Sequence, residues 1–161
     1  MLPEELMERL GKAVAFEGGV LGPLTRIIGQ RVAYGDFTDG GGASATLALD
    51  EKIPAGSRYK FAVINTTTAF TADTTAVVTI GDGSDADRFS PDTDDKSMYT
   101  TGVLTIDPAD PADAGDGISE IEAETGITLT ITGTGDWGDN VVAGEADVFI
   151  VYEHIPYLAC E

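Results

Sequence analysis

The chain has 161 residues, of which 42% are hydrophobic and 23% charged, a composition that suits one globular domain and excludes a disordered chain. Its 28 acidic and 9 basic side chains give a net charge of -19, which disfavours binding to nucleic-acid phosphates or to an anionic membrane. The single cysteine has no partner for a disulfide, and no apolar run approaches the roughly 20 residues that a membrane helix needs. We therefore expect a soluble protein with no signal peptide.

The charge is distributed unevenly along the chain. Residues 1–31 contain four basic and four acidic side chains, so residues 32–161 carry the whole net charge of -19. The sequence thus predicts a neutral N-terminal segment followed by a strongly acidic body. Such a surface keeps copies of a protein from associating nonspecifically.

The sequence of residues 1–30 predicts a short helix followed by an arm. Pro3 suits the first helical turn, and Glu4 and Glu5 stand where the helix dipole favours negative charge. Apolar residues at four-residue spacing predict a helix over residues 3–14, and the glycine-rich residues 13–30 predict irregular chain. This segment either covers one end of the following domain or reaches a neighbouring subunit or another protein. In the second case the partner-binding residues are Leu2, Leu6, Leu10, Val14, Phe16, Leu21 and Ile27.

From residue 31 onward the sequence predicts short strands separated by glycine and proline turns. We expect strands at 31–37, 45–49, 59–65, 76–81, 98–106, 127–132 and 147–152. Closely spaced strands without helices predict an all-β antiparallel sandwich over residues 31–161. We expect a jelly-roll-like fold, with an immunoglobulin-like sandwich as the alternative, because the strand order cannot be read from the sequence.

The last two predicted strands carry the clearest pattern. Residues 127–132 alternate strictly between apolar residues and threonine, which predicts one buried and one solvated face. Residues 147–152 are apolar at every position but the first, which predicts a strand buried on both faces. We expect the two to be antiparallel, and Phe149 and Val151 are candidates for packing against a neighbouring sheet or subunit.

The sequence does not predict catalysis or a cofactor. The aspartates at 82, 85 and 87 suggest calcium, but the twelfth position counted from Asp82 is Thr93 where a helix–loop–helix site needs Glu. The single His154 and the single Cys160 form no recognisable zinc site or nucleophile motif. We therefore expect neither a metal site nor an enzyme.

Trp137 lies in the glycine-rich stretch 133–140 and has two interpretations. Its ring could stack on a sugar or anchor a protein interface. It could instead fold back and close the open end of the sandwich. We include Trp137 among the partner-binding candidates on the first interpretation.

Three stretches resemble a known family: Ile53–Ser57, Tyr59–Ile64 and Ala143–Tyr152. They are similar to parts of the decoration (cement) proteins on the capsids of tailed phages. The resemblance implies a jelly-roll or related sandwich that forms a homotrimer, binds the major capsid protein on the capsid exterior and stabilises the assembled shell. It also implies assembly in the host cytoplasm and no catalytic residues. The alternative function is a module that binds saccharide or a host surface, as in a head fibre or tail component.

Overall fold

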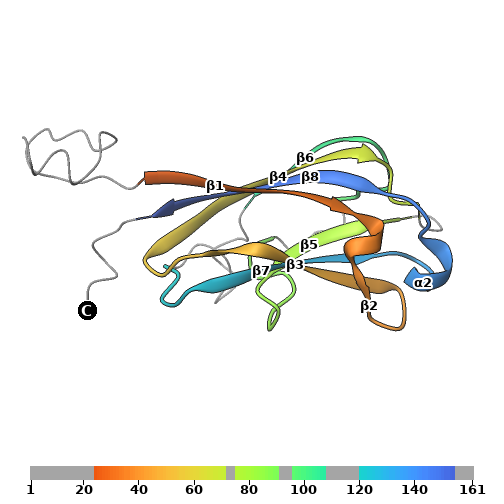
Figure 1. Cartoon of the computed structure of the whole chain (residues 1–161), viewed down its shortest axis with the longest axis horizontal. Helices are drawn as coiled ribbons and strands as arrows, with labels where there is room; N and C mark the ends of the chain where they lie inside the picture. The colour runs from red at the N-terminus through yellow and green to blue at the C-terminus, as the bar shows by residue number, and fades with distance from the viewer. Residues whose placement is uncertain (1–23, 72–74, 91–95, 108–119, 155–161) are drawn as a thin grey trace, which may run out of the picture.

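The computed structural model describes residues 24–71, 75–90, 96–107 and 120–154. These residues form two antiparallel four-stranded sheets that pack face to face (Figure 1). The expected all-β sandwich is therefore confirmed. The expected helix over residues 3–14 lies outside the described residues, as does most of the expected arm.

The two sheets are named here by their strand order. Sheet A has the order β1 (Leu24–Ala33), β8 (Glu145–His154), β4 (Ser57–Thr68), β6 (Gly102–Ile106). Sheet B has the order β2 (Thr38–Asp39), β3 (Ser44–Ile53), β7 (Thr125–Thr132), β5 (Val77–Gly81). Two short helices, η1 (Tyr34–Asp36) and α2 (Trp137–Asn140), lie in the connections. No helix in the described part of the chain could cross a membrane.

The connections make the sandwich a jelly roll. From β3 onward the chain alternates between sheets, except that residues 96–98 stay beside β5 before the chain crosses to β6. There Val77 bridges Ser97, and the Met98 amide donates to the Ala76 carbonyl over 2.8 Å. A sheet ordered β1-β8-β4-β6 against one ordered β3-β7-β5 has the two interlocked Greek keys of a jelly roll. The immunoglobulin-like alternative would have a different strand order.

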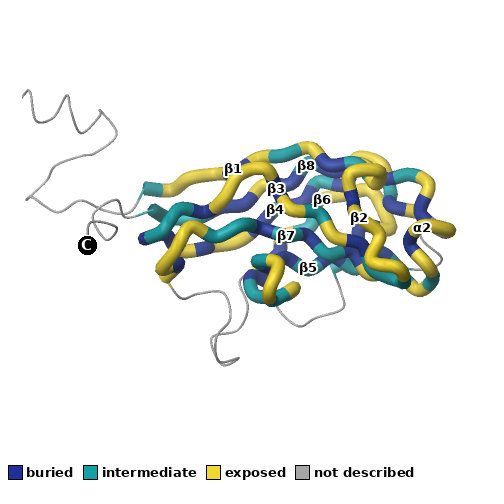
Figure 2. Tube along the Cα trace, turned by 60° about the horizontal axis from the view of Figure 1, so that its bottom comes forward, coloured by how far each residue is buried: buried dark blue, intermediate teal, exposed yellow. Residues whose placement is uncertain are grey.

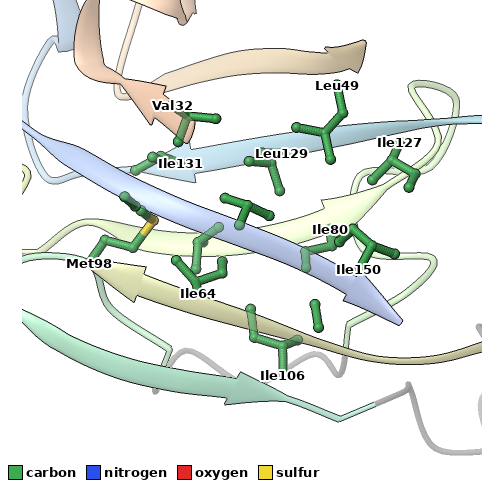
Figure 3. Packing of buried hydrophobic residues seen from close by; sticks show 14 of the residues in the cluster. Val32, Leu49, Ile64, Ile80, Met98, Ile106, Ile127, Leu129, Ile131 and Ile150 are labelled. Carbon is green, nitrogen blue, oxygen red and sulfur yellow. The ribbon is translucent and has the colours of Figure 1, made fainter. Parts of the chain in front are cut away.

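The core lies between the sheets and follows from the alternation along the strands. On β7 the side chains of Ile127, Leu129 and Ile131 are fully buried, whereas the intervening threonines face outward. Ile64 and Ile150 meet them from sheet A (Figure 3). Each such side chain contributes about 1.5–3 kcal/mol by leaving water.

The first strand begins earlier than the sequence predicted. Residues 24–30, expected as irregular arm, belong to β1 and pair along their length with β8. Ile28 and Val32 point into the core, whereas Tyr34, expected in this strand, begins η1. The pairing partner of β1 is β8, the last strand of the described chain. The sequence around residues 24–30 therefore did not indicate this pairing.

The stretches 127–132 and 147–152, expected as two antiparallel strands, are both strands but do not pair with each other. The first of these stretches is in β7 of sheet B and the second is in β8 of sheet A. The glycine-rich stretch between them crosses from one sheet to the other instead of forming a hairpin. The strand at 147–152 is also not buried on both faces, because Phe149 is 40% exposed.

Candidate interaction surface

The outward face of sheet A carries apolar side chains from all four of its strands. We call this set the sheet A patch: Ile27 of β1, Phe61 and Val63 of β4, Val103 of β6, and Phe149 and Val151 of β8. The register places Ile27, Val151 and Phe61 directly opposite one another across three strands. Opposite residues of antiparallel strands point to the same face, so these side chains adjoin.

The sheet A patch is exposed although it is apolar. Val103 is 67% and Ile27 63% exposed, and Phe149 and Phe61 are 40% and 36% exposed. Figure 2 shows that much of β1 is exposed. Val151 is buried without belonging to the core cluster, because its neighbours on the outward face cover it. Contiguous exposed apolar side chains of this kind mark interaction surfaces.

A glycine opposite Phe149 shapes the middle of the sheet A patch. Gly29 of β1 faces Phe149 of β8 in the register. A Cβ at Gly29 would lie 3.3 Å from Cδ1 of that ring, so the ring rests on the bare backbone of β1. The absence of a side chain at Gly29 therefore leaves room for the Phe149 ring against β1.

Ion pairs border the apolar centre at both ends. The Arg31 guanidinium donates to both carboxylate oxygens of Asp147, over 2.8 and 3.2 Å. This hydrogen bonding lowers the pKa of Asp147 below its ordinary value. At the other end Lys60 Nζ lies 3.5 Å from Glu153 Oε1. An apolar centre with a charged rim is the anatomy of a protein interface.

The charge of sheet A differs from that of the whole chain. Its four strands carry four basic and three acidic side chains, a net charge of +1, whereas the chain carries -19. The basic ones are Arg26, Arg31, Arg58 and Lys60, and the acidic ones are Glu145, Asp147 and Glu153. The face is thus free of the acidic excess that would repel another acidic protein.

The outward face of sheet B is chemically different. Thr46, Thr130 and Thr79 lie opposite one another across β3, β7 and β5. Beside them the hydroxyls of Ser44 and Thr132 are hydrogen bonded over 3.0 Å. The outward face of sheet B is therefore rich in hydroxyl groups. The apolar outward surface is therefore confined to sheet A in the described strands.

Trp137 lies in the core and not at the surface. Its side chain is 4% exposed, and its ring is 5.7 Å from that of Phe37, which in turn lies 5.9 Å from Phe70. The Asp136 carboxylate accepts a hydrogen bond from the Gly138 amide and so begins the short α2 that carries the indole. The indole closes one end of the sandwich, as the second interpretation expected, and its ring is not available to stack on a saccharide.

Two polar constellations have structural explanations. The Ser57 hydroxyl and His154 Nδ1 are 3.0 Å apart, which resembles a nucleophile and base, but Ser57 is fully buried and cannot meet a substrate. Asp82 accepts hydrogen bonds from Ser84, Asp85 and Arg88 and thereby shapes its turn. In the described part of the chain no group of three or more potential ligands could hold a metal ion.

Of the predicted partner-binding residues, Ile27 belongs to the sheet A patch and Trp137 to the core. The other six, Leu2, Leu6, Leu10, Val14, Phe16 and Leu21, lie outside the described residues. Phe149 and Val151 were expected to pack against a neighbour, and the structure brings them together with Ile27. Phe61 and Val103 were not among the predicted residues. The signal for Phe61 was the run of apolar residues at both odd and even positions of 59–65.

No protein-family model matches the chain, and no curated protein matches it. Among solved structures, a chain of the "Cyanophage Pam1 capsid asymmetric unit" is similar to it, with a TM-score of 0.53 and 16% sequence identity. The similarity covers 88% of this chain and 93% of that chain. At this identity the likeness establishes a shared fold, and it extends over nearly the whole of both chains.

Proposed function

We propose that this protein is a structural component of a phage virion that binds the outer surface of the capsid and stabilises the assembled shell, as a homotrimer. The observation that carries the proposal is the shared fold with a chain of a cyanophage capsid over 88% of this chain. The exposed sheet A patch supports the proposal, because contiguous apolar patches on a protein surface mark sites of interaction with other proteins.

The partners in this proposal are the major capsid protein and further copies of this chain, on the capsid exterior, with assembly in the host cytoplasm. The net charge of -19 supports an exterior position away from the packaged genome, since like charges repel. The apolar side chains before β1, namely Leu2, Leu6, Leu10, Val14, Phe16 and Leu21, are the proposed contacts outside the sandwich.

The stabilising effect follows from linkage. A protein that binds the assembled shell and not its dissociated subunits stabilises the shell by about 2.7 kcal/mol per site when its free concentration is 100 times its Kd. A trimer engages several sites at once, and this raises its effective affinity without any new contact.

The test is co-sedimentation with empty shells assembled from the major capsid protein of the same genome. We expect the full chain to pellet with the shells and to raise their melting temperature. A truncated chain for comparison should lack residues 1–22, because β1 begins at Leu24 and a longer deletion would remove part of the sheet. Failure of the full chain to pellet with mature shells would contradict the proposal.

The saccharide-binding alternative has lost the residue on which it depended. It needed Trp137 at the surface, and the indole is buried against Phe37. A glycan array tests this alternative directly. Binding by the wild-type chain that is lost in a folded Trp137 variant would support saccharide binding.

A further inference from the structure

An exposed apolar face that spans all four strands of a sheet needs a covering partner. Three occupants are conceivable for the sheet A patch: a second sheet A, the capsid protein, or a segment of this chain that precedes β1. The geometry of the chain favours the third. This inference rests on the trimer in the proposed function and names the surface that holds it together.

We propose that the segment 1–23 of one copy covers the sheet A patch of a neighbouring copy. The segment carries the predicted helix whose apolar stripe is Leu2, Leu6, Leu10 and Val14. It joins the sandwich at Leu24, the first residue of β1, which is an edge strand of sheet A itself.

The dimensions of the stripe and of the sheet A patch match. Four strands spaced about 4.8 Å apart span about 14 Å from β1 to β6. As the helix that the sequence predicts, the stretch from Leu2 to Val14 is about 18 Å long at 1.5 Å per residue. Val103 lies in the register row of Arg31, four residues along β1 from Ile27, so the diagonal from Ile27 to Val103 is about 20 Å. One helix of this length therefore covers most of the sheet A patch.

The charges are also compatible. The segment 1–23 has four acidic and two basic side chains, a net charge of -2, and the strands of sheet A have a net charge of +1. Contact between them brings together weakly opposite charges. The acidic excess lies in the rest of the chain, so contact outside sheet A is on average less favourable for this segment.

Symmetry argues for a neighbouring copy and against two sheet A faces in contact. Face-to-face packing of identical surfaces is isologous and produces pairs. A segment that docks on a different surface of the next copy is a heterologous contact, which gives a ring such as a trimer when the rotation between copies closes.

The test compares three single substitutions in the full chain. Val103→Asp introduces a charge into the sheet A patch, and Leu6→Asp introduces one into the stripe of the segment. Val142→Asp is the matched control, because Val142 is 69% exposed, close to the 67% of Val103, and lies outside sheet A. The readout is molar mass by size-exclusion chromatography with light scattering, with circular dichroism to verify folding.

We expect the wild-type chain and Val142→Asp to have the mass of three chains of 16.8 kDa, and the other two variants to be folded monomers. A mixture of Leu6→Asp with Val103→Asp is the sharpest arm. The first variant keeps an intact sheet face and the second an intact segment, so together they should form a dimer with one copy of each. If Val103→Asp does not fold, Ile27→Asp on β1 replaces it.

Other outcomes overturn the inference. A folded Val103→Asp that stays trimeric excludes the sheet A patch from the contact. A Leu6→Asp variant that stays oligomeric while Val103→Asp dissociates indicates two sheet A faces in contact. A monomeric wild-type chain, or a variant mixture that stays monomeric, excludes docking between copies. These masses are measured without shells, so co-sedimentation of the wild-type chain decides the proposed function separately.

Discussion

The ring of Phe70 lies directly against the backbone of Gly144. A Cβ at Gly144 would be 2.5 Å from two carbons of that ring, and the glycine has a φ of +155°, which side-chain-bearing residues rarely adopt. Phe70 is fully buried at the end of the sandwich, where it also meets Phe37 edge to face. The two residues therefore fix the path by which the chain leaves α2 and enters β8.

Gly144→Ala should accordingly lower the free energy of unfolding by about 2–4 kcal/mol, since it combines overpacking with backbone strain. Urea denaturation monitored by circular dichroism measures the change. Gly29→Ala is the control: its Cβ would meet only the edge of the Phe149 ring at 3.3 Å, at the surface, and we expect a change below about 1 kcal/mol. Equal costs at the two glycines would contradict the packing described for Phe70.

Trp137→Ala should destabilise the sandwich by about 3–5 kcal/mol, because it removes a buried indole from its contact with Phe37. The wild-type chain offers a direct readout, since Trp137 is its single tryptophan. We expect its fluorescence emission to lie at shorter wavelength in the folded protein than in urea. Emission that is the same in both states would mean that the indole is solvated.

The two faces of β7 should respond differently to truncation. Ile131→Ala leaves a cavity in the core and should cost about 2–5 kcal/mol. Thr130→Ala, one residue away on the hydroxyl-rich outward face, should cost less than about 1 kcal/mol. Thermal unfolding of both variants gives the comparison, and similar costs would indicate that the alternation on β7 is misassigned.

Asp82 should confer stability that depends on pH. Burial by itself raises the pKa of Asp82, but the hydrogen bonds from Ser84, Arg88 and the Asp85 amide outweigh burial and hold the pKa below its usual range. A lowered pKa in the folded state stabilises the fold above about pH 3.9, the ordinary value of an aspartate, and this contribution is lost as the pH falls toward the folded pKa.

Asp82→Asn should therefore cost about 1–3 kcal/mol near pH 7, and the difference from wild type should shrink below about pH 4. Urea unfolding at pH 7, 5 and 3 measures it. The exposed Asp50 accepts no comparable set of hydrogen bonds in the described residues, so Asp50→Asn should change the free energy by less than about 0.5 kcal/mol at each pH. A pH-independent effect of Asp82→Asn would contradict the role of its charge.

Most of the strands could be predicted from the sequence, whereas their partners could not. A two-residue period is a local property, so Ile127, Leu129 and Ile131 identified both a strand and its buried face. Pairing in a jelly roll is non-local, and nothing near residues 147–152 indicates that β8 joins β1 and not β7. For this reason the sequence did not show that the two antiparallel strands belong to different sheets.

The candidate surface was predictable only in fragments. Ile27 and Phe149 stood out as apolar residues at positions that suggested contact with a neighbour. Val103 did not, because a lone valine on a short strand is ordinary, and only the register shows that it shares a face with Phe61. A surface assembled from four separate strands exists only once the strand order is known.

The pairing of β1 with β8 has a consequence for synthesis on the ribosome. Leu24 faces His154 and Ala33 faces Glu145, so the first strand of the sandwich finds its partner only in the last. At about 5–20 residues per second, roughly 6 to 20 seconds pass between the synthesis of β1 and that of β8, and β1 lacks its pairing partner during this time. Folding is then a step taken after translation, slowed by its many distant contacts. A chain truncated from the C-terminal side lacks β8, which lies between β1 and β4 in sheet A. Such truncations should therefore yield aggregates instead of smaller domains.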